Sequence, residues 1–197
     1  MTLNVLLSLM GFALVTSITP GPNNMMLLSS GATFGLRRTV PHLLGVALGF
    51  GAMAFAMGLG LSQLFRAAPK VEFGFKVVAA LYMLWLAWKI AHAAAPDETG
   101  QSDARPITFL QAAAFQWVNP KAWAMALTAV SVYAASTEPS AIALVALVFV
   151  ITNLPCVTLW AWSGQALRRW LTTSARLRLF NWAMAALLVA SLWPVLV

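Results

Sequence analysis

Residues 139–167 read PSAIALVALVFVITNLPCVTLWAWSGQAL and contain no charged side chain. An apolar run of more than roughly 18 residues is typical of a helix that crosses a membrane. Further uncharged stretches divide the rest of the chain, at residues 1–36, 39–65, 106–120, 122–137 and 179–197. The sequence therefore predicts an all-α polytopic membrane protein.

The composition of the 197-residue chain supports this fold class. Charged residues make up 9% of the chain, whereas an ordinary soluble domain carries about 25%. A surface with so few charges cannot face water on all sides, which excludes a soluble enzyme and a soluble nucleic-acid-binding domain. The formal charge of +7 is therefore assigned to loops between spans. The single cysteine, Cys156, excludes an internal disulfide and is expected to be a buried packing residue.

Charges and helix-breaking residues divide the chain into about six expected transmembrane helices. These spans cover residues 3–33, 41–64, 71–93, 107–134, 140–164 and 179–197. A polar cytoplasmic linker at 94–106 separates a first half, residues 1–93, from a second half, residues 107–197, within a single membrane domain. The first run is too long for a signal-peptide core and lacks a basic start, so we expect it to be a retained span.

The basic residues predict the orientation of the chain. Eight of them follow the first, third and fifth spans, and three lie on the other side. The first group is Arg37, Arg38, Lys89, Arg105, Arg168, Arg169, Arg176 and Arg178, and the second is Arg66, Lys70 and Lys76. Because loops rich in lysine and arginine stay in the cytoplasm, both termini are expected outside.

Spans 1 and 4 are each interrupted by a polar break that contains proline. The first break reads Thr19-Pro20-Gly21-Pro22-Asn23-Asn24 and the second reads Asn119-Pro120-Lys121. The breaks fall at corresponding positions of two three-helix halves, which must be inverted relative to each other. Inverted repeats with matched helix breaks indicate the central binding site of a transporter.

The breaks have a chemistry that suits a small zwitterion. Pro20 and Pro22 leave the carbonyls of Thr16 and Ile18 without helical donors, and Pro120 does the same to Gln116. Free carbonyls can bind an ammonium group. Asn23 or Asn24 is expected to cap a half-helix that starts at Met25, whose N–H groups would favour a carboxylate. This pattern favours amino acids over metals or lipids.

Further intramembrane polar residues are candidates for binding or proton coupling. Lys121 lies within an apolar run, where a charge is costly and indicates function, although a lysine that snorkels to the interface is the alternative. Asn153 is expected to hydrogen-bond across helices and is a second-tier site residue. His42 is expected at the interface, with proton coupling as a lesser possibility. Glu72 is expected to form a surface pair with Lys76.

Two residue patterns have structural interpretations. Most of the tryptophans are expected to form an interfacial belt, namely Trp85, Trp88, Trp160, Trp162, Trp170, Trp182 and Trp193. The pairs Gly31/Gly35 and Gly45/Gly49 allow close helix packing or dimerisation. The sequence contains no catalytic set, nucleotide loop or metal-ligand cluster, so we expect no enzyme activity and no cofactor.

The sequence resembles the LysE/RhtB family of amino-acid exporters over essentially the whole chain. The resemblance rests on two motifs, Thr19–Asn23 and, about a hundred residues later, Gln116-Trp117-Val118-Asn119-Pro120-Lys121. Gly35, Arg37 and the small residues from Gly45 onward add to this resemblance. It implies a bacterial inner-membrane exporter driven by the proton motive force. Members of the family transport basic amino acids, threonine, homoserine, homoserine lactone, leucine or metabolites of the cysteine pathway. The resemblance assigns Pro20 to Asn23 to one half of the site, and Asn119 to Lys121 to the other.

The sequence therefore predicts a secondary transporter that exports small neutral amino acids or close derivatives, similar to threonine, homoserine or leucine. Neutral side chains are favoured because no acidic residue clearly lies within a span to balance a positive one. A basic amino-acid exporter and a non-transporting accessory or scaffold protein are the alternatives, and a membrane enzyme or an ion transporter has less support. A homodimer is expected from family habit. The candidate binding residues are Thr19, Pro20, Gly21, Pro22, Asn23, Asn24, Gln116, Asn119, Pro120, Lys121 and Asn153. The candidate proton-coupling residues are Lys121, His42 and Glu72.

Overall fold

The computed structural model describes residues 1–61, 69–93 and 105–192, and these ranges form helices without strands. Side chains are described for all of them except residues 69–72, 75 and 76. The helices are α1 (Leu3–Ile18), α2 (Pro22–Phe34), α3 (Leu36–Ala56), η1 (Met57–Leu61), α5 (Pro69–Ala91), α6 (Phe109–Val118), α7 (Pro120–Tyr133), α8 (Pro139–Leu167) and α9 (Ser174–Ala190).

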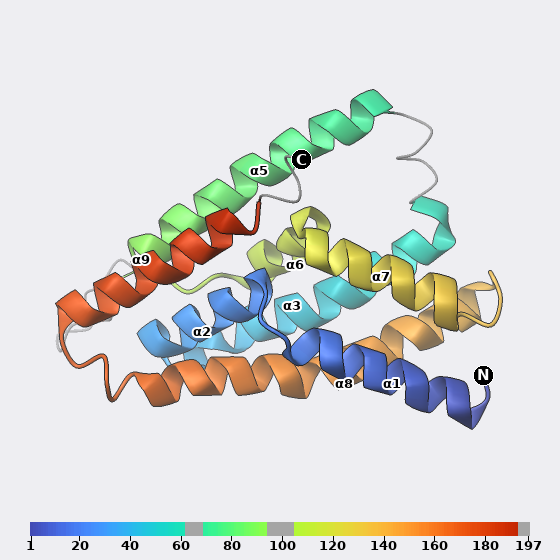
Figure 1. The fold of residues 1–197 in the computed structure, drawn as a ribbon, viewed down its shortest axis with the longest axis horizontal. Coiled ribbons are helices and arrows are strands. Elements are labelled where there is room, and N and C mark those ends of the chain that lie inside the picture. The colour runs from blue at the N-terminus through green and yellow to red at the C-terminus, as the bar shows by residue number, and fades with distance from the viewer. Residues whose placement is uncertain (62–68, 94–104, 193–197) are drawn as a thin grey trace.

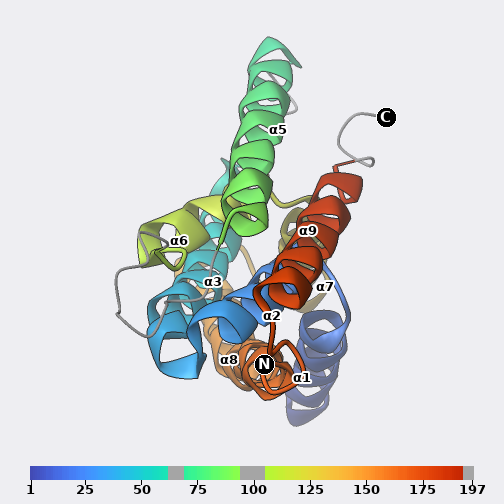
Figure 2. The same cartoon turned by 90° about the vertical axis from the view of Figure 1, so that its left-hand side faces the viewer.

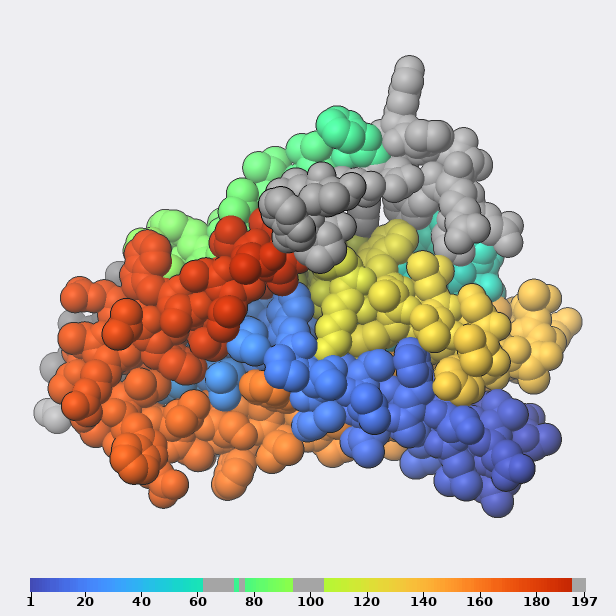
Figure 3. Space-filling view, viewed as in Figure 1, coloured from blue at the N-terminus to red at the C-terminus, as the bar shows by residue number. Residues whose placement is uncertain are grey.

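Helix α8 is the longest of the described helices (Figure 1). It runs along one side of the molecule and packs against α1, α2 and α3. Helix α3 also packs against α6, and α1 lies beside α7 on the face shown in Figure 3. Helices α5 and α9 pack against each other on the side away from α8 (Figure 2). Helix α2 lies between α8 and the α5–α9 pair, since it contacts all three.

The helices confirm the class of helical membrane protein, whereas the count of six spans stays a prediction. Within the described residues, Leu36–Leu61 and Pro139–Leu167 are each long and apolar enough to cross a membrane alone. Helices α1 and α2 meet the same test only as a pair, bent by 56°. The segment Val77–Ala91 is apolar but shorter. Apolar side chains are widely exposed on these helices, as expected for surfaces that face lipid.

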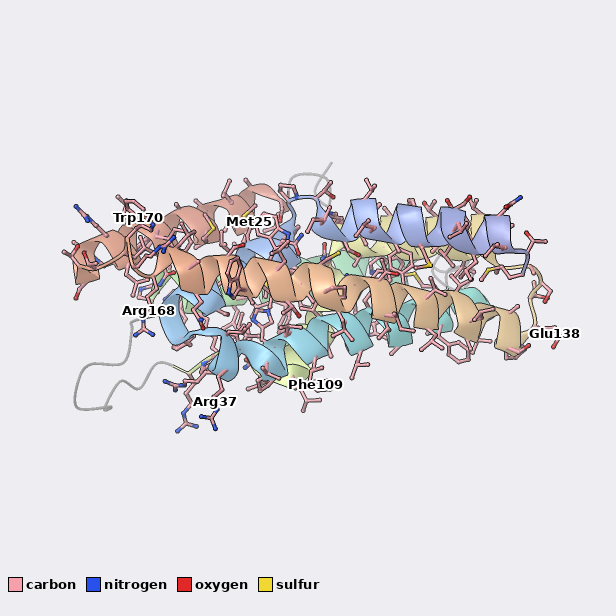
Figure 4. The ribbon with its side chains drawn as sticks, turned by 90° about the horizontal axis from the view of Figure 1, so that it is seen from below. Met25, Arg37, Phe109, Glu138, Arg168 and Trp170 are labelled. Carbon is pink, nitrogen blue, oxygen red and sulfur yellow. The ribbon has the colours of Figure 1, made fainter. Side chains whose placement is uncertain are left out.

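Two helix starts differ from the prediction. The second span was expected to begin at 41, but α3 begins at Leu36, directly after Gly35, whose φ of 78° turns the chain. The last span was expected to begin at 179, but α9 begins at Ser174, where the Thr173 hydroxyl accepts a hydrogen bond from the Arg176 amide. Arg37 and Arg168 lie at one end of the bundle and Glu138 at the other (Figure 4). Two of the basic residues that the sequence assigns to one side thus lie at the same end of the bundle.

Glycines allow the central helices to touch backbone to backbone. A Cβ on Gly31 of α2 would overlap the Ala161 carbonyl of α8, and a Cβ on Gly164 of α8 would overlap the Leu28 carbonyl of α2. Gly45 and Gly49 of α3 face the backbone of α6 in the same way. Gly31, Gly45 and Gly49 therefore serve packing within the chain, Gly35 serves the turn before α3, and dimerisation is not needed to explain them.

The buried apolar side chains form two clusters along the bundle. One contains residues of α2, α6 and the C-terminal half of α8, and the other contains residues of α1, α7 and the N-terminal half of α8. Both helix breaks fall where one cluster gives way to the other. Asn153 lies at the same boundary within α8, between Phe149 and Val157. The polar break residues are therefore concentrated in the middle of the bundle.

Candidate functional site

The two helix breaks lie against each other. In the first break, Thr19 and Gly21 have extended backbones, and α2 restarts with Pro22 as its first residue. In the second, Asn119 has an extended backbone and α7 restarts with Pro120. Proline is suited to the first position of a helix because its fixed φ is already helical and its missing N–H would have no partner there.

A pair of amide side chains joins the two breaks. Asn23 Nδ2 donates to Gln116 Oε1 over 2.8 Å, and Gln116 Nε2 donates back to Asn23 Oδ1 over 3.0 Å. Gln116 is fully buried and also donates to the Ala112 carbonyl of its own helix. Two segments 93 residues apart are therefore held together by a reciprocal hydrogen-bonded pair.

The carbonyls freed by the prolines have partners within the protein. Trp160 Nε1 of α8 donates to the Ile18 carbonyl over 3.0 Å, and the Thr19 hydroxyl donates to the Thr16 carbonyl over 3.1 Å. Asn24 Nδ2 donates to the carbonyls of Ser17 and Thr19, over 2.9 and 2.8 Å. The expectation that these carbonyls stand free for a ligand is therefore wrong for this state of the protein, because side chains occupy them.

Lys121 provides a second connection between the breaks. Its ammonium donates to the Thr19 carbonyl over 2.8 Å, to the Thr19 hydroxyl over 3.0 Å and to the Pro20 carbonyl over 3.2 Å. The lysine stem lies directly over Gly21, where a Cβ would come within 2.8 Å of the lysine Cδ. The ammonium of Lys121, in the second half of the chain, thus binds oxygens of Thr19 and Pro20 in the first half.

Asn119 and Asn153 complete the polar cluster. The Asn119 side chain caps α7 by accepting from the Lys121 amide over 3.1 Å. Asn153 Nδ2 donates to the Ser17 hydroxyl over 3.0 Å, which confirms the predicted hydrogen bond across helices. The Asn153 Oδ1 atom is buried without a hydrogen-bond partner. A buried acceptor in this position is suited to an N–H or O–H donor from a ligand.

A small cavity of about 20 Å³ lies at this junction. It has room for about one water molecule. Residues of both breaks and of helices α1, α3, α7 and α8 line it: Thr16, Ser17, Gly21, Asn23, Asn24, Phe50, Asn119, Lys121, Ala122, Met125, Asn153 and Val157. No described lining residue is acidic. An amino acid would need the cavity to widen.

The structure brings most of the predicted site residues together. Gly21, Asn23, Asn24, Asn119, Lys121 and Asn153 line the cavity, and Gln116 joins them through Asn23. Thr19 and Pro20 lie at the protein surface beside Lys121, while Pro22 and Pro120 start the second half-helices. The predicted half-helix start at Met25, capped by Asn23 or Asn24, is wrong. Gly21 precedes the first helical residue, and both asparagines make the contacts described above.

His42, another candidate for proton coupling, does not line this cavity. His42 is fully buried within the protein, and its place at the membrane interface stays a prediction. Its Nδ1 atom lies 3.0 Å from the Ser30 hydroxyl, and its Nε2 atom has no partner. The burial follows from the early start of α3, which places His42 in its second turn. The Glu72 side chain, and its predicted pair with Lys76, lie outside the described residues.

Three residues of the site were missing from the sequence prediction. Thr16 and Ser17 line the cavity from the last turn of α1. Their signal was available, because both are hydroxyl residues directly before the break. Trp160 was assigned to the interfacial belt, but it is only partly exposed and donates to Ile18. Nothing in the sequence distinguishes it from the exposed Trp162 two residues later.

The described residues hold no group of three His, Cys, Asp or Glu side chains that could bind a metal ion. The polar groups where the two breaks meet are amides, hydroxyls, carbonyls and the ammonium of Lys121. Such groups bind and orient a polar molecule by hydrogen bonding.

Comparisons with known proteins show the family of this chain and several relatives. Residues 14–191 match the family model described as LysE type translocator. A cysteine/O-acetylserine efflux protein of Klebsiella pneumoniae is 30% identical over 191 residues, which cover 96% of this chain and 95% of the relative. The protein of the same name from Escherichia coli strain K12 is 36% identical over 134 residues, covering 68% and 67% of the two chains. No solved structure matches this chain.

Proposed function

The chain belongs to the LysE type translocator family, and on this premise we propose that it exports a small neutral amino acid across the bacterial inner membrane. The observation that carries the proposal is the junction of the two helix breaks, where the Asn23–Gln116 pair and Lys121 meet beside a polar cavity. Broken helices that meet in the middle of a bundle are the usual site of substrate binding in secondary transporters.

The groups at the junction complement both ends of an amino acid. The carbonyls of Thr19 and Pro20 can accept hydrogen bonds from the α-ammonium. The N-terminal ends of α2 and α7 both border the cavity, and helix N-termini favour a carboxylate. Asn153 Oδ1 is a free acceptor for a polar substrate side chain.

The cavity favours a small and uncharged substrate side chain. A cationic side chain would meet Lys121 with no acidic residue in the described lining to balance it. Phe50, Met125 and Val157 provide an apolar wall. The sequence favours threonine-, homoserine- or leucine-like substrates, and the names of the relatives add cysteine and O-acetylserine. All of these are small neutral amino acids.

Transport by alternating access of two inverted halves is part of the proposal. Under that symmetry α1 corresponds to α6, and α8 to α3. The observed packing of α1 on α8 and of α6 on α3 supports this correspondence. We also propose that the basic end of the bundle faces the cytoplasm, with the N-terminus outside. The proposed energy source is the proton motive force, and the buried His42 is a candidate coupling group.

The experiment that tests the proposal is amino-acid efflux from cells loaded with dipeptides, with and without the protein. The panel contains cysteine, threonine, homoserine, leucine and lysine, and O-acetylserine is supplied directly. We expect faster efflux of one or more neutral members, and loss of that efflux in Asn23→Ala and Asn119→Ala. Asn4→Ala is the matched control, because Asn4 is exposed near the start of α1.

Three outcomes would contradict parts of this proposal. Efflux of lysine alone would retain the exporter but overturn the preference for neutral side chains. Normal efflux by both asparagine variants would remove the proposed site. No efflux of any amino acid, with the protein verified in the membrane, would favour the accessory-protein alternative. An uncoupler that leaves efflux unchanged would exclude the proton motive force.

A further inference from the structure

We propose that Lys121 is an internal substitute for the substrate, whose ammonium occupies the α-ammonium site while the carrier is empty. The inference rests on the proposed function and adds to it. In this scheme the substrate displaces Lys121 from the first break on binding, and Lys121 returns when the substrate leaves. The lysine thereby allows the empty protein to complete its cycle.

The contacts of Lys121 are those expected of a bound ammonium group. An ammonium has three N–H donors, and three oxygens of Thr19 and Pro20 surround Nζ at 2.8 to 3.2 Å. Two of these oxygens are main-chain carbonyls that lack their usual helical donors because Thr19, Pro20 and Gly21 are not helical. The α-ammonium of an amino acid presents the same three donors. The lysine therefore demonstrates that the first break can bind such a group.

Gly21 provides independent support, because its backbone does not require glycine. Its φ of −179° and ψ of 175° describe an extended conformation open to any residue. What glycine provides is space for the lysine. A Cβ at this position would lie 2.8 Å from Lys121 Cδ and 3.1 Å from Nζ. The absence of a side chain at 21 is therefore explained by the path of Lys121 to the oxygens.

Electrostatics make the two ammonium groups mutually exclusive. Both are positive and would use the same oxygens, so binding of one removes the other. Without Lys121 the Thr19 carbonyl would keep the Asn24 amide as a donor, but the Pro20 carbonyl and the Thr19 hydroxyl would lose the ammonium, which is unfavourable within a membrane. Once displaced, the lysine is still tethered beside the cavity, where the substrate carboxylate can attract it. The same side chain thus stabilises the empty break and then neutralises the bound substrate.

Two other roles for Lys121 make different predictions. A lysine that only binds the carboxylate would be needed for every transport mode, since its loss would weaken substrate binding. A lysine that only holds the break together would be needed for folding, so its loss would lower stability and all activities together. An internal substitute is needed only when the empty carrier must return. Exchange of substrate for substrate does not require the empty carrier to change its orientation.

The test uses the full-length protein in liposomes with radiolabelled cysteine and threonine as probes. Net efflux into buffer is compared with exchange against the same unlabelled amino acid outside. For Lys121→Met we expect net efflux to fall by about tenfold or more, since a lost hydrogen bond to a charged group shifts an equilibrium by at least about that factor. Exchange should fall less than net efflux, because loss of the lysine removes its attraction for the substrate carboxylate in both modes but removes the internal substitute only from net efflux.

Two further variants keep the test decisive. Gly21→Ala pushes the lysine away without removing its charge, and it should show the same selective loss of net efflux. Lys89→Met is the matched control, because Lys89 is also a partly buried lysine but donates to Pro106 and Gln111, away from the breaks. Loss of exchange to the same extent as net efflux in both break variants would overturn the inference. Failure of the wild-type protein to move either probe would instead count against the proposed function.

Discussion

The contact between α2 and α8 predicts that Gly31→Ala destabilises the protein. Helix α2 carries Asn23 and Asn24, so its position against α8 fixes half of the candidate site. At Gly31 an added Cβ would overlap the Ala161 carbonyl oxygen and carbon. Both helices meet through backbone at this point, because Gly164 faces the Leu28 carbonyl in the same way. No flexible side chain is available to move aside.

The expected magnitude follows from two opposing terms. Replacing glycine by alanine within a helix favours the helix by about 1 kcal/mol. Overpacking of a close contact costs about 1 to 3 kcal/mol, with backbone contacts at the upper end because they yield least. The net loss for Gly31→Ala is therefore about 1 to 2 kcal/mol. Displacement of α2 should also weaken the Asn23–Gln116 pair, so efflux should fall with stability.

The assay measures the apparent melting temperature of the purified protein in detergent. The readout is the fraction of protein that stays monodisperse after heating. Gly11→Ala is the matched control, because Gly11 is also helical and a Cβ there has no neighbour within 4 Å. We expect Gly11→Ala to melt at or slightly above the wild-type temperature and Gly31→Ala several degrees below it. A Gly31→Ala protein as stable as the Gly11→Ala protein would refute the backbone contact between α2 and α8.

Three further predictions concern the hydrogen bonds of the bundle. A double-mutant cycle of Asn23→Ala and Gln116→Ala should give a coupling energy of about 1 kcal/mol, in the range measured for membrane helices, and additive effects would contradict the reciprocal pair. Trp160→Phe should destabilise the protein by about 1 to 3 kcal/mol, because it leaves the partly buried Ile18 carbonyl without its donor. Trp162 is 53% exposed, so Trp162→Phe should melt like the wild-type protein. Asn181→Leu should lower the melting temperature, because the buried Asn181 side chain bonds the hydroxyls of Ser29 and Thr33 in α2 and the Ala93 carbonyl just beyond α5. An unchanged melting temperature would show that these hydrogen bonds add nothing to stability.

The sequence was sufficient to locate the helix breaks because proline and glycine act on the backbone locally. The breaks expected at Thr19–Asn24 and Asn119–Lys121 coincide with the interruptions between α1 and α2 and between α6 and α7. The wrong start of the first half-helix has a local cause too. Pro22 is suited to the first helical position, whereas the prediction gave more weight to the capping preference of the asparagines.

Long-range partners were beyond the reach of the sequence. Asn23 and Gln116 were both candidates, but no local pattern indicates that they bond to each other. His42 follows a proline that looks like a helix start, yet α3 begins five residues earlier, so His42 is buried. Trp160 and Trp162 are equivalent as residue types, and only the position of α8 against the first break separates their roles.

The small size of the cavity follows from the way the breaks are satisfied. Helix breaks in an apolar bundle are tolerated only if each freed carbonyl finds a donor. Here the donors are side chains: Trp160, Asn24, Thr19 and Lys121. A substrate that binds these oxygens must displace some of those donors, and each displaced donor must then find another acceptor. Lys121 can use the substrate carboxylate as its new acceptor, so one exchange of partners satisfies both. A zwitterion meets this requirement, whereas an amine without a carboxylate would leave the lysine unpaired. Selection for amino acids over simple amines would thus follow from the hydrogen bonds that close the empty site.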